Sequence, residues 1–120
     1  MKDSYTLWSI RGLLFVFDIE NARDLNREEV IVSKNVNDAE ELSELFDILI
    51  RPEFFIYTEM ERQRLIDTLV YFLDRRDTFD EIFTKMDTYF EDEVSDRRQF
   101  MIVLLGRLKS YQSEDVNGVN

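Results

Sequence analysis

The amino-acid sequence predicts a mainly α-helical fold, a compact bundle of four or five helices around a buried C-terminal helix at residues 96–111. Apolar residues recur at intervals of three and four along several segments, which is the spacing of one helix face. Polar residues that cap helix N-termini precede three of these segments. On its length, the chain forms one helical domain at residues 1–111, followed by a polar, disordered tail at 112–120.

The first third of the chain is compatible with helix or strand. In residues 4–20 the apolar side chains fall on two faces of a helix, and the smaller face carries Trp8 and Phe15. We expect Trp8 to pack against a neighbouring helix, because a large aromatic side chain gains most when it is covered. Short strands at 13–19 or at the β-branched triplet 30–32 remain alternatives.

The next helix begins at Asn37 or Asp38. A glutamate follows either residue at the spacing of a capping box, and apolar residues then recur at helical spacing from 42 to 49. The helix is expected to end at Arg51, because the residue before a proline avoids the α conformation.

A second capping box, Thr58 with Glu61, opens a helix that is expected to reach Arg76. Its apolar residues form one broad face. Tyr71 projects to the opposite, polar side and is therefore the clearest candidate for an exposed aromatic.

A third capping box, Thr78 with Glu81, precedes apolar residues that match the spacing of a helix face closely, which predicts a helix over 78–90. The acids at 91–93 oppose a helix dipole at a C-terminus, so we place them in a loop.

The C-terminal helix is apolar on nearly every side. Phe100, Val103, Leu104, Leu108 and Tyr111 share one face, and other apolar residues cover the remainder. A helix of this kind is usually buried on most faces, which predicts a central position in the bundle.

Composition excludes most kinds of enzyme. The chain has neither cysteine nor histidine, which rules out nucleophilic triads, zinc sites with nitrogen or sulfur ligands, and disulfides. No glycine-rich phosphate loop is present among only three glycines. We therefore expect a protein that is not an enzyme and carries no cofactor, in a reducing cytoplasm.

The negative charge is concentrated in two segments. Residues 38–50 carry five acids and no base, and residues 78–96 carry seven acids and one base. Together they account for the whole net charge of −11. The four bases in 97–111 are expected to pair with acids of 78–96 rather than to bind nucleic acid. The net negative charge of the protein surface would repel both nucleic acids and anionic membranes.

These acids suggest the binding residues for a basic protein partner. With one exposed tyrosine, the candidates are Glu40, Glu44, Asp47, Tyr71, Asp80, Asp87 and Glu91. The last three acids lie on one stripe of the helix expected at 78–90, but the stripe is convex, so a metal site is not expected there.

Three functions fit this sequence. The first is an acidic inhibitor, most typically a bacterial immunity protein that blocks a nuclease-type toxin by covering its cationic active site. No motif identifies a family, so this hypothesis is based on general character alone. The first alternative is a helical adaptor that uses an apolar interface around Trp8 and Phe15, with homo-oligomerisation. The second is a carboxylate and magnesium-dependent enzyme.

Overall fold

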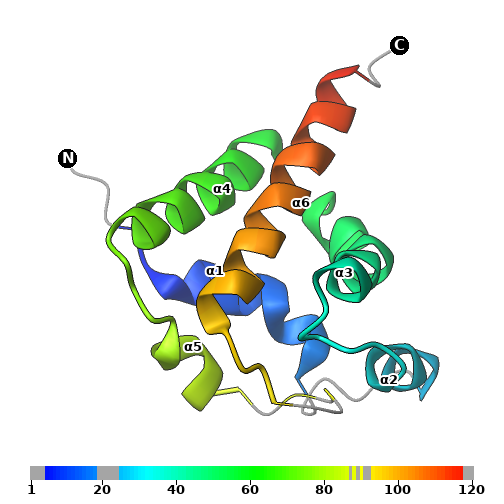
Figure 1. Cartoon of the computed structure of the whole chain (residues 1–120). Helices are drawn as coiled ribbons and strands as arrows, with labels where there is room; N and C mark the ends of the chain where they lie inside the picture. Colours follow the sequence, from blue (N-terminus) through cyan, green and yellow to red (C-terminus); the bar gives the residue numbers. More distant parts are fainter. Residues whose placement is uncertain (1–4, 19–24, 87, 89, 91–92, 118–120) are drawn as a thin grey trace.

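The computed structural model describes residues 5–18, 25–86, 88, 90 and 93–117 (Figure 1). Within these residues the fold is helical, with six α-helices and one short 3₁₀ helix. They are α1 (Leu7–Leu14), η1 (Phe15–Phe17), α2 (Leu25–Val32), α3 (Ala39–Phe54), α4 (Glu59–Asp74), α5 (Asp80–Thr84) and α6 (Arg97–Asn117). The predicted helical bundle around the C-terminal helix is confirmed.

Helix α6 runs through the middle of the molecule, with α3 on one side and α4 on the other (Figure 1). Asp47 contacts Arg107, and Arg51, one turn later, contacts Glu114, so α3 and α6 run in the same direction. Arg98 reaches the C-terminal end of α4, so α4 runs in the opposite direction. The N-termini of α3 and α6 therefore meet at one end of the molecule.

The core is an aromatic cluster centred on Phe100. Its ring lies 5.3 Å from the rings of Phe46 and Phe83, edge to face in both cases, and 5.9 Å from Phe90. Phe17 extends the cluster, with its ring 5.1 Å from that of Phe90. In an edge-to-face contact the positive edge of one ring meets the negative face of the other, which is favourable. The cluster therefore holds η1, α3 and α6 against one another.

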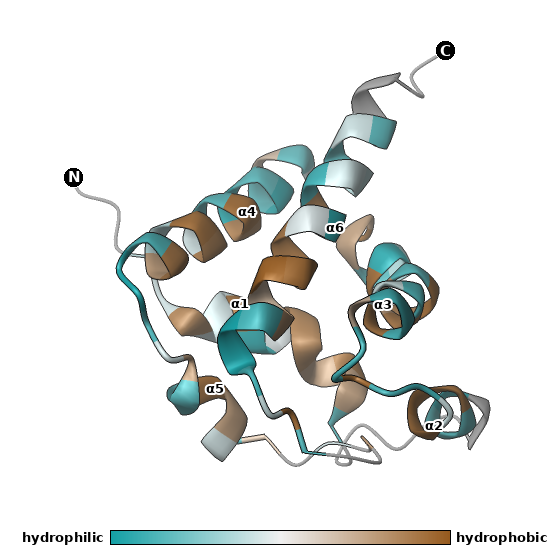
Figure 2. Ribbon diagram, viewed as in Figure 1, coloured by the Kyte–Doolittle hydropathy of each residue, from teal (hydrophilic) through white to brown (hydrophobic). Residues whose placement is uncertain are grey.

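The central helix is buried on one side only. Phe100, Met101, Leu104, Leu108 and Tyr111 are buried, whereas Ile102 is 47% exposed. The hydrophobic part of α6 is its first half, after the basic first turn (Figure 2). The helix also continues to Asn117, beyond the end at residue 111 that the sequence predicted for it.

The strand alternatives of the first third are wrong. Residues 13–17 belong to α1 and η1, and the triplet 30–32 ends α2. The described residues contain one isolated antiparallel bridge, between Asp18 and Thr88, and no strand. Helix formation here gives Leu7, Leu13 and Phe17 a common side that enters the core.

The first two capping signals are largely confirmed. Thr58 and Glu61 form both bonds of a capping box, at 3.2 and 2.8 Å. The carboxylate of Asp38 caps α3 by accepting from the amides of Glu40 and Glu41, but the side chain of Glu41 turns to the amide of Asn35 instead of closing the box.

Helix α3 continues for two residues beyond Pro52, so the predicted end at Arg51 is wrong. In the last turn, a proline removes only one backbone hydrogen bond. Phe54, at the end of the helix, is fully buried and its ring lies 6.1 Å from that of Tyr111. Burial of this ring offsets the loss of the bond.

The helix predicted at 78–90 is also wrong, because α5 ends at Thr84. The third capping box does not form. Phe79 takes the N-cap position in a left-handed conformation with φ of 63°, and Thr78 only accepts a 3.3 Å bond from the amide of Asp80. Ile82, Met86 and Phe90 still point into the core region, so their spacing reflected burial and not a continuous helix.

Gly106 offers a first test of the helical assignment. It lies exposed within α6, and an added Cβ atom would meet no atom within 4 Å. We expect Gly106→Ala to raise the free energy of unfolding by about 1 kcal/mol, since alanine loses less backbone entropy on entering a helix. Urea denaturation monitored by circular dichroism measures this change. A neutral or destabilising result would contradict a regular helix at this position.

Candidate partner-binding surfaces

The two acidic segments meet at the end of the molecule where α3 and α6 begin. Asn37, just before α3, donates to the carbonyl oxygen of Glu93 at 3.0 Å. Its side-chain oxygen accepts from the amide of Ser95 at 2.9 Å and from the hydroxyl of Ser95 at 3.1 Å. One asparagine side chain therefore joins two loops that are far apart in the sequence.

We call the carboxylates around this junction the acidic edge. Its members are Asp38, Glu40, Glu41, Glu44, Glu93 and Asp96. Asp38 and Asp96 have a structural role, because their side chains accept backbone amides at the starts of α3 and α6. Glu40 and Glu93 are exposed and extend the negative charge outward.

The structure places two of the predicted binding acids, Glu40 and Glu44, on the acidic edge. Glu44 forms a 2.8 Å ion pair with Lys34, and this hydrogen bond raises the pKa of Lys34 above its ordinary value. The pair is solvent-exposed and contributes little to stability, so a stronger basic group can replace Lys34 at small cost.

Asp47 and Asp80 both pair with arginines of α6. The carboxylate of Asp47 accepts from the hydroxyl of Tyr111 at 2.5 Å and pairs with Arg107 at 3.0 Å, which connects α3 to α6. Asp80 of α5 pairs with Arg97 at 2.6 Å. Asp47 has two partners within the chain, which weakens it as a partner contact, whereas the pair formed by Asp80 is as exposed as that of Glu44.

Two other candidates, Asp87 and Glu91, lie outside the described residues. The continuous helix that was expected to align them with Asp80 ends at Thr84. Within the described residues, no group of three or more carboxylates is arranged to hold a metal ion.

Tyr71 is half-buried, so its prediction as an exposed aromatic is wrong. Its ring lies 5.1 Å from that of Tyr5 and 5.0 Å from that of Phe72, and the Arg75 guanidinium lies 4.2 Å from it. Tyr5, which precedes α1 and is absent from the helical projection of α4, packs on the side of α4 that was expected to be exposed.

Three of the four bases of the last helix bond to other parts of the chain, but only one of them, Arg97, follows the prediction. Arg97 pairs with Asp80 of the 78–96 segment. Arg107 pairs with α3, and Arg98 donates to the carbonyls of Leu73 and Asp77, where it caps the C-terminal end of α4. A cation in that position also interacts favourably with the helix dipole.

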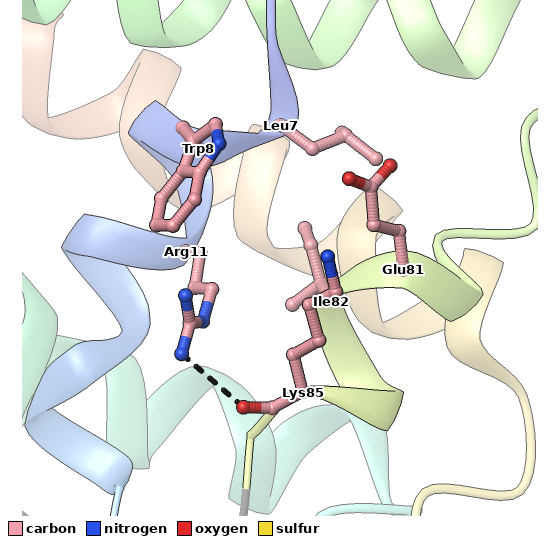
Figure 3. Close-up of a pocket in the computed structure, with 6 residues that line it drawn as sticks. All are labelled: Leu7, Trp8, Arg11, Glu81, Ile82 and Lys85. Atoms are coloured by element: carbon pink, nitrogen blue, oxygen red, sulfur yellow. Dashed lines mark hydrogen bonds between the residues drawn. The ribbon is translucent and has the colours of Figure 1, made fainter.

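Trp8 is 67% exposed, which contradicts the expectation that it packs against a neighbouring helix. The guanidinium of Arg11 lies 5.1 Å from the centre of its ring and donates to the carbonyl of Lys85 at 3.2 Å (Figure 3). Phe15, two turns along the same side of α1 and η1, is 42% exposed. Aromatic residues and arginine are the types that dominate protein interfaces, so this is a second candidate surface.

The crevice beside Trp8 is too small for a ligand. It encloses about 10 Å³ between α1 and α5, which is the room needed by one water molecule. Its lining residues are Leu7, Trp8, Arg11, Glu81, Ile82 and Lys85 (Figure 3). The crevice is therefore too small to be a small-molecule site, and this face stays a candidate for protein contact.

A larger groove of about 290 Å³ lies between α2 and α3. Apolar side chains such as Val30 and Ile48 form most of its wall, with Arg27 and Glu53 as its charged groups. The charges of Arg27 and Glu53 cancel, so the groove has no net charge that would favour an anionic or a cationic ligand. We therefore assign no ligand to it.

No protein-family model, curated protein or solved structure matches this chain. Among the helices that the structure describes, none has the length and apolarity required to cross a membrane. Function must therefore be inferred from the two surfaces themselves.

Proposed function

We propose that this chain is an acidic binding protein that neutralises a basic protein partner, most specifically an immunity protein that covers the cationic active site of a nuclease-type toxin. The observation that carries the proposal is the acidic edge, where two acidic segments come together because Asn37 bonds to Glu93 and Ser95, more than fifty positions further along the chain. Inhibition would need no chemistry from this chain, only occlusion of the partner's site.

The charge of the edge suits such a partner. Four of its six carboxylates, including Glu40 and Glu44, come from α3 and its N-cap, and Lys34 pairs with Glu44. A nuclease active site is positively charged because it binds a phosphate backbone. Attraction between the acidic edge and a basic active site would raise the association rate constant. Added salt screens this attraction, so the rate constant should fall as the salt concentration rises.

The rigidity of the edge also favours binding. Asn37, in the loop before α3, bonds to two residues of the loop before α6, and the caps of α3 and α6 hold the neighbouring backbone. A surface that is ordered before binding loses less entropy when it meets its partner. The contact residues in this proposal are therefore Glu40, Glu44 and Glu93, without Asp47 and Asp80.

Charge reversal at the edge tests the proposal. We expect Glu40→Lys combined with Glu93→Lys to raise the Kd for the natural partner by about 100-fold, because like charges would then face each other. The wild-type chain, immobilised, captures the partner from cells of its source, and a salt gradient elutes it. Binding and nuclease inhibition are then measured with the purified partner.

A matched control carries the same charge change on α4, as Glu59→Lys with Asp74→Lys, at two exposed positions. It should bind nearly as well as the wild-type chain. The proposal would be contradicted if the edge variant bound the partner as tightly as the wild type does. It would also be contradicted if the salt gradient did not elute the captured partner.

A further inference from the structure

The exposed side of α1 is a second surface that the acidic edge does not explain. It consists of Trp8, Arg11, Gly12 and Phe15, which we call the α1 face. These positions fall on one side of a helix, since seven residues make almost two full turns. The two aromatic side chains at its ends are 67% and 42% exposed.

Gly12 leaves the centre of this face open. A Cβ atom added there would meet nothing within 4 Å, so no neighbouring part of the protein requires glycine at this position. The Arg11 guanidinium lies against the Trp8 ring and bonds to the carbonyl of Lys85 beside α5, so it does not cover Gly12 (Figure 3). The backbone of α1 is therefore open to close approach between two aromatic side chains.

The geometry points to a second copy of this chain as the occupant, in a symmetric dimer through α1. The stripe is nearly symmetric about the point between Arg11 and Gly12. In an antiparallel pair of α1 helices, Trp8 of each copy would meet Phe15 of the other, and the glycines would lie at the crossing. A two-fold interface requires a surface that is complementary to itself in this way.

The charge distribution favours the same arrangement. Each chain carries a net charge of −11, so two copies repel each other over most orientations. Helix α1 contains no acid, and its one charged residue is Arg11. Contact through α1 brings no acid of this helix into the interface, although Glu81 lies beside Trp8, and salt should strengthen the dimer by screening the remaining repulsion.

The size of the face sets the strength to expect. One short helix with two exposed aromatics covers less than the roughly 800 Å² per partner of a standard stable interface. The dimer is therefore weak, and it forms in the upper micromolar to millimolar range of chain concentration.

The protein contains its own reporter, because Trp8 is the only tryptophan in the chain. We expect sedimentation equilibrium to show the average mass rising from monomer toward dimer as the concentration increases. The emission of Trp8 should shift to the blue over the same range, as the partner's Phe15 covers the indole. Both changes should occur at lower concentration when the salt is raised.

Two glycine variants provide a matched pair. Gly12→Glu places bulk and like charge at the proposed crossing and should weaken self-association by at least about tenfold. Gly106→Glu makes the same change at an exposed glycine of α6 with equally open surroundings and should dimerise like the wild type. Circular dichroism checks that both variants fold. If Gly12→Glu does not fold, Trp8→Gln gives the same test with mass as the readout.

A monomeric mass and unchanged emission up to millimolar concentration in high salt would overturn the inference, whatever other partner the face binds. So would a dimer that persists in Gly12→Glu, or one abolished by Gly106→Glu. The lysine substitutions at Glu40 and Glu93 should leave the dimer intact. Failure of this inference and failure of the proposed function therefore give different results.

Discussion

Replacement of Phe100 by alanine is expected to lower the free energy of unfolding by about 3–5 kcal/mol, the usual cost of removing a fully buried aromatic ring. Phe100 is 1% exposed, and its ring contacts three other phenylalanines, Phe46, Phe83 and Phe90. Its loss leaves a cavity and removes the edge-to-face contacts by which Phe46 and Phe83 pack on α6. Urea denaturation at neutral pH measures the change.

Ile102 of the same helix is the control, because it is 47% exposed. We expect Ile102→Ala to change the free energy of unfolding by no more than about 1 kcal/mol, as for other surface positions. If Phe100→Ala is too unstable for a folded baseline, Phe100→Leu retains much of the volume and should cost about 1–2 kcal/mol. Equal costs for alanine at 100 and 102 would contradict the position of α6 in the core.

The sequence was sufficient to predict the bundle because apolar spacing and capping reflect short-range physics. The capping box at Thr58 depends on two residues three positions apart, and it forms as predicted. The buried residues of α6 recur at helical intervals for the same local reason. These signals do not depend on how the helices are arranged in space.

The segment that begins at Thr78 shows where that reasoning fails. Its apolar residues have helical spacing, yet the helix ends at Thr84 and the backbone continues to a bridge between Thr88 and Asp18. Spacing identifies which side chains are buried, and here both Phe83 and Phe90 reach Phe100 without a continuous helix. The choice between the two conformations is made by long-range contacts.

The candidate binding site was only partly predictable for the same reason. The charge of the segments was visible in the sequence, and Glu40 lies at the acidic edge. The parallel directions of α3 and α6 bring Glu93 to that edge, and no local pattern encodes a direction. Asp47 appeared to be a surface acid because Arg107 and Tyr111, its partners, are sixty and more residues away.

Trp8 was misplaced by a different assumption. Large aromatic residues are usually covered, so packing was the natural expectation. The sequence does contain two signals of an exposed aromatic surface. They are Arg11, which lies over the indole, and Gly12, which is small. Arginine can shield one side of an exposed ring from water, and this makes exposure less costly.

Alkaline pH should destabilise this protein through Tyr111. Burial raises the pKa of this phenol above its ordinary value, and the hydrogen bond to the Asp47 carboxylate raises it further. The folded state therefore favours the neutral phenol. That contribution to stability is complete below the ordinary tyrosine pKa of about 10 and is lost as pH rises from there toward the folded-state pKa.

The loss should approach about 1.4 kcal/mol of unfolding free energy for each pH unit above this point, from Tyr111 alone. Urea denaturation from pH 8 to 11 measures it. Burial also raises the pKa of Tyr57, so part of the decline should remain in any Tyr111 variant.

The variant Tyr111→Phe separates the contribution of Tyr111 from that of Tyr57. At neutral pH it should be less stable than the wild type by about 1.5–3 kcal/mol, because it loses a hydrogen bond to a charged group. Above pH 10 its stability should decline less steeply, so the gap between the two proteins narrows. Asp47→Asn removes the neighbouring charge and should also reduce the slope. A parallel decline in wild type and Tyr111→Phe would show that Tyr111 does not resist ionisation, and that the contact between α3 and α6 at Asp47 is not the one described.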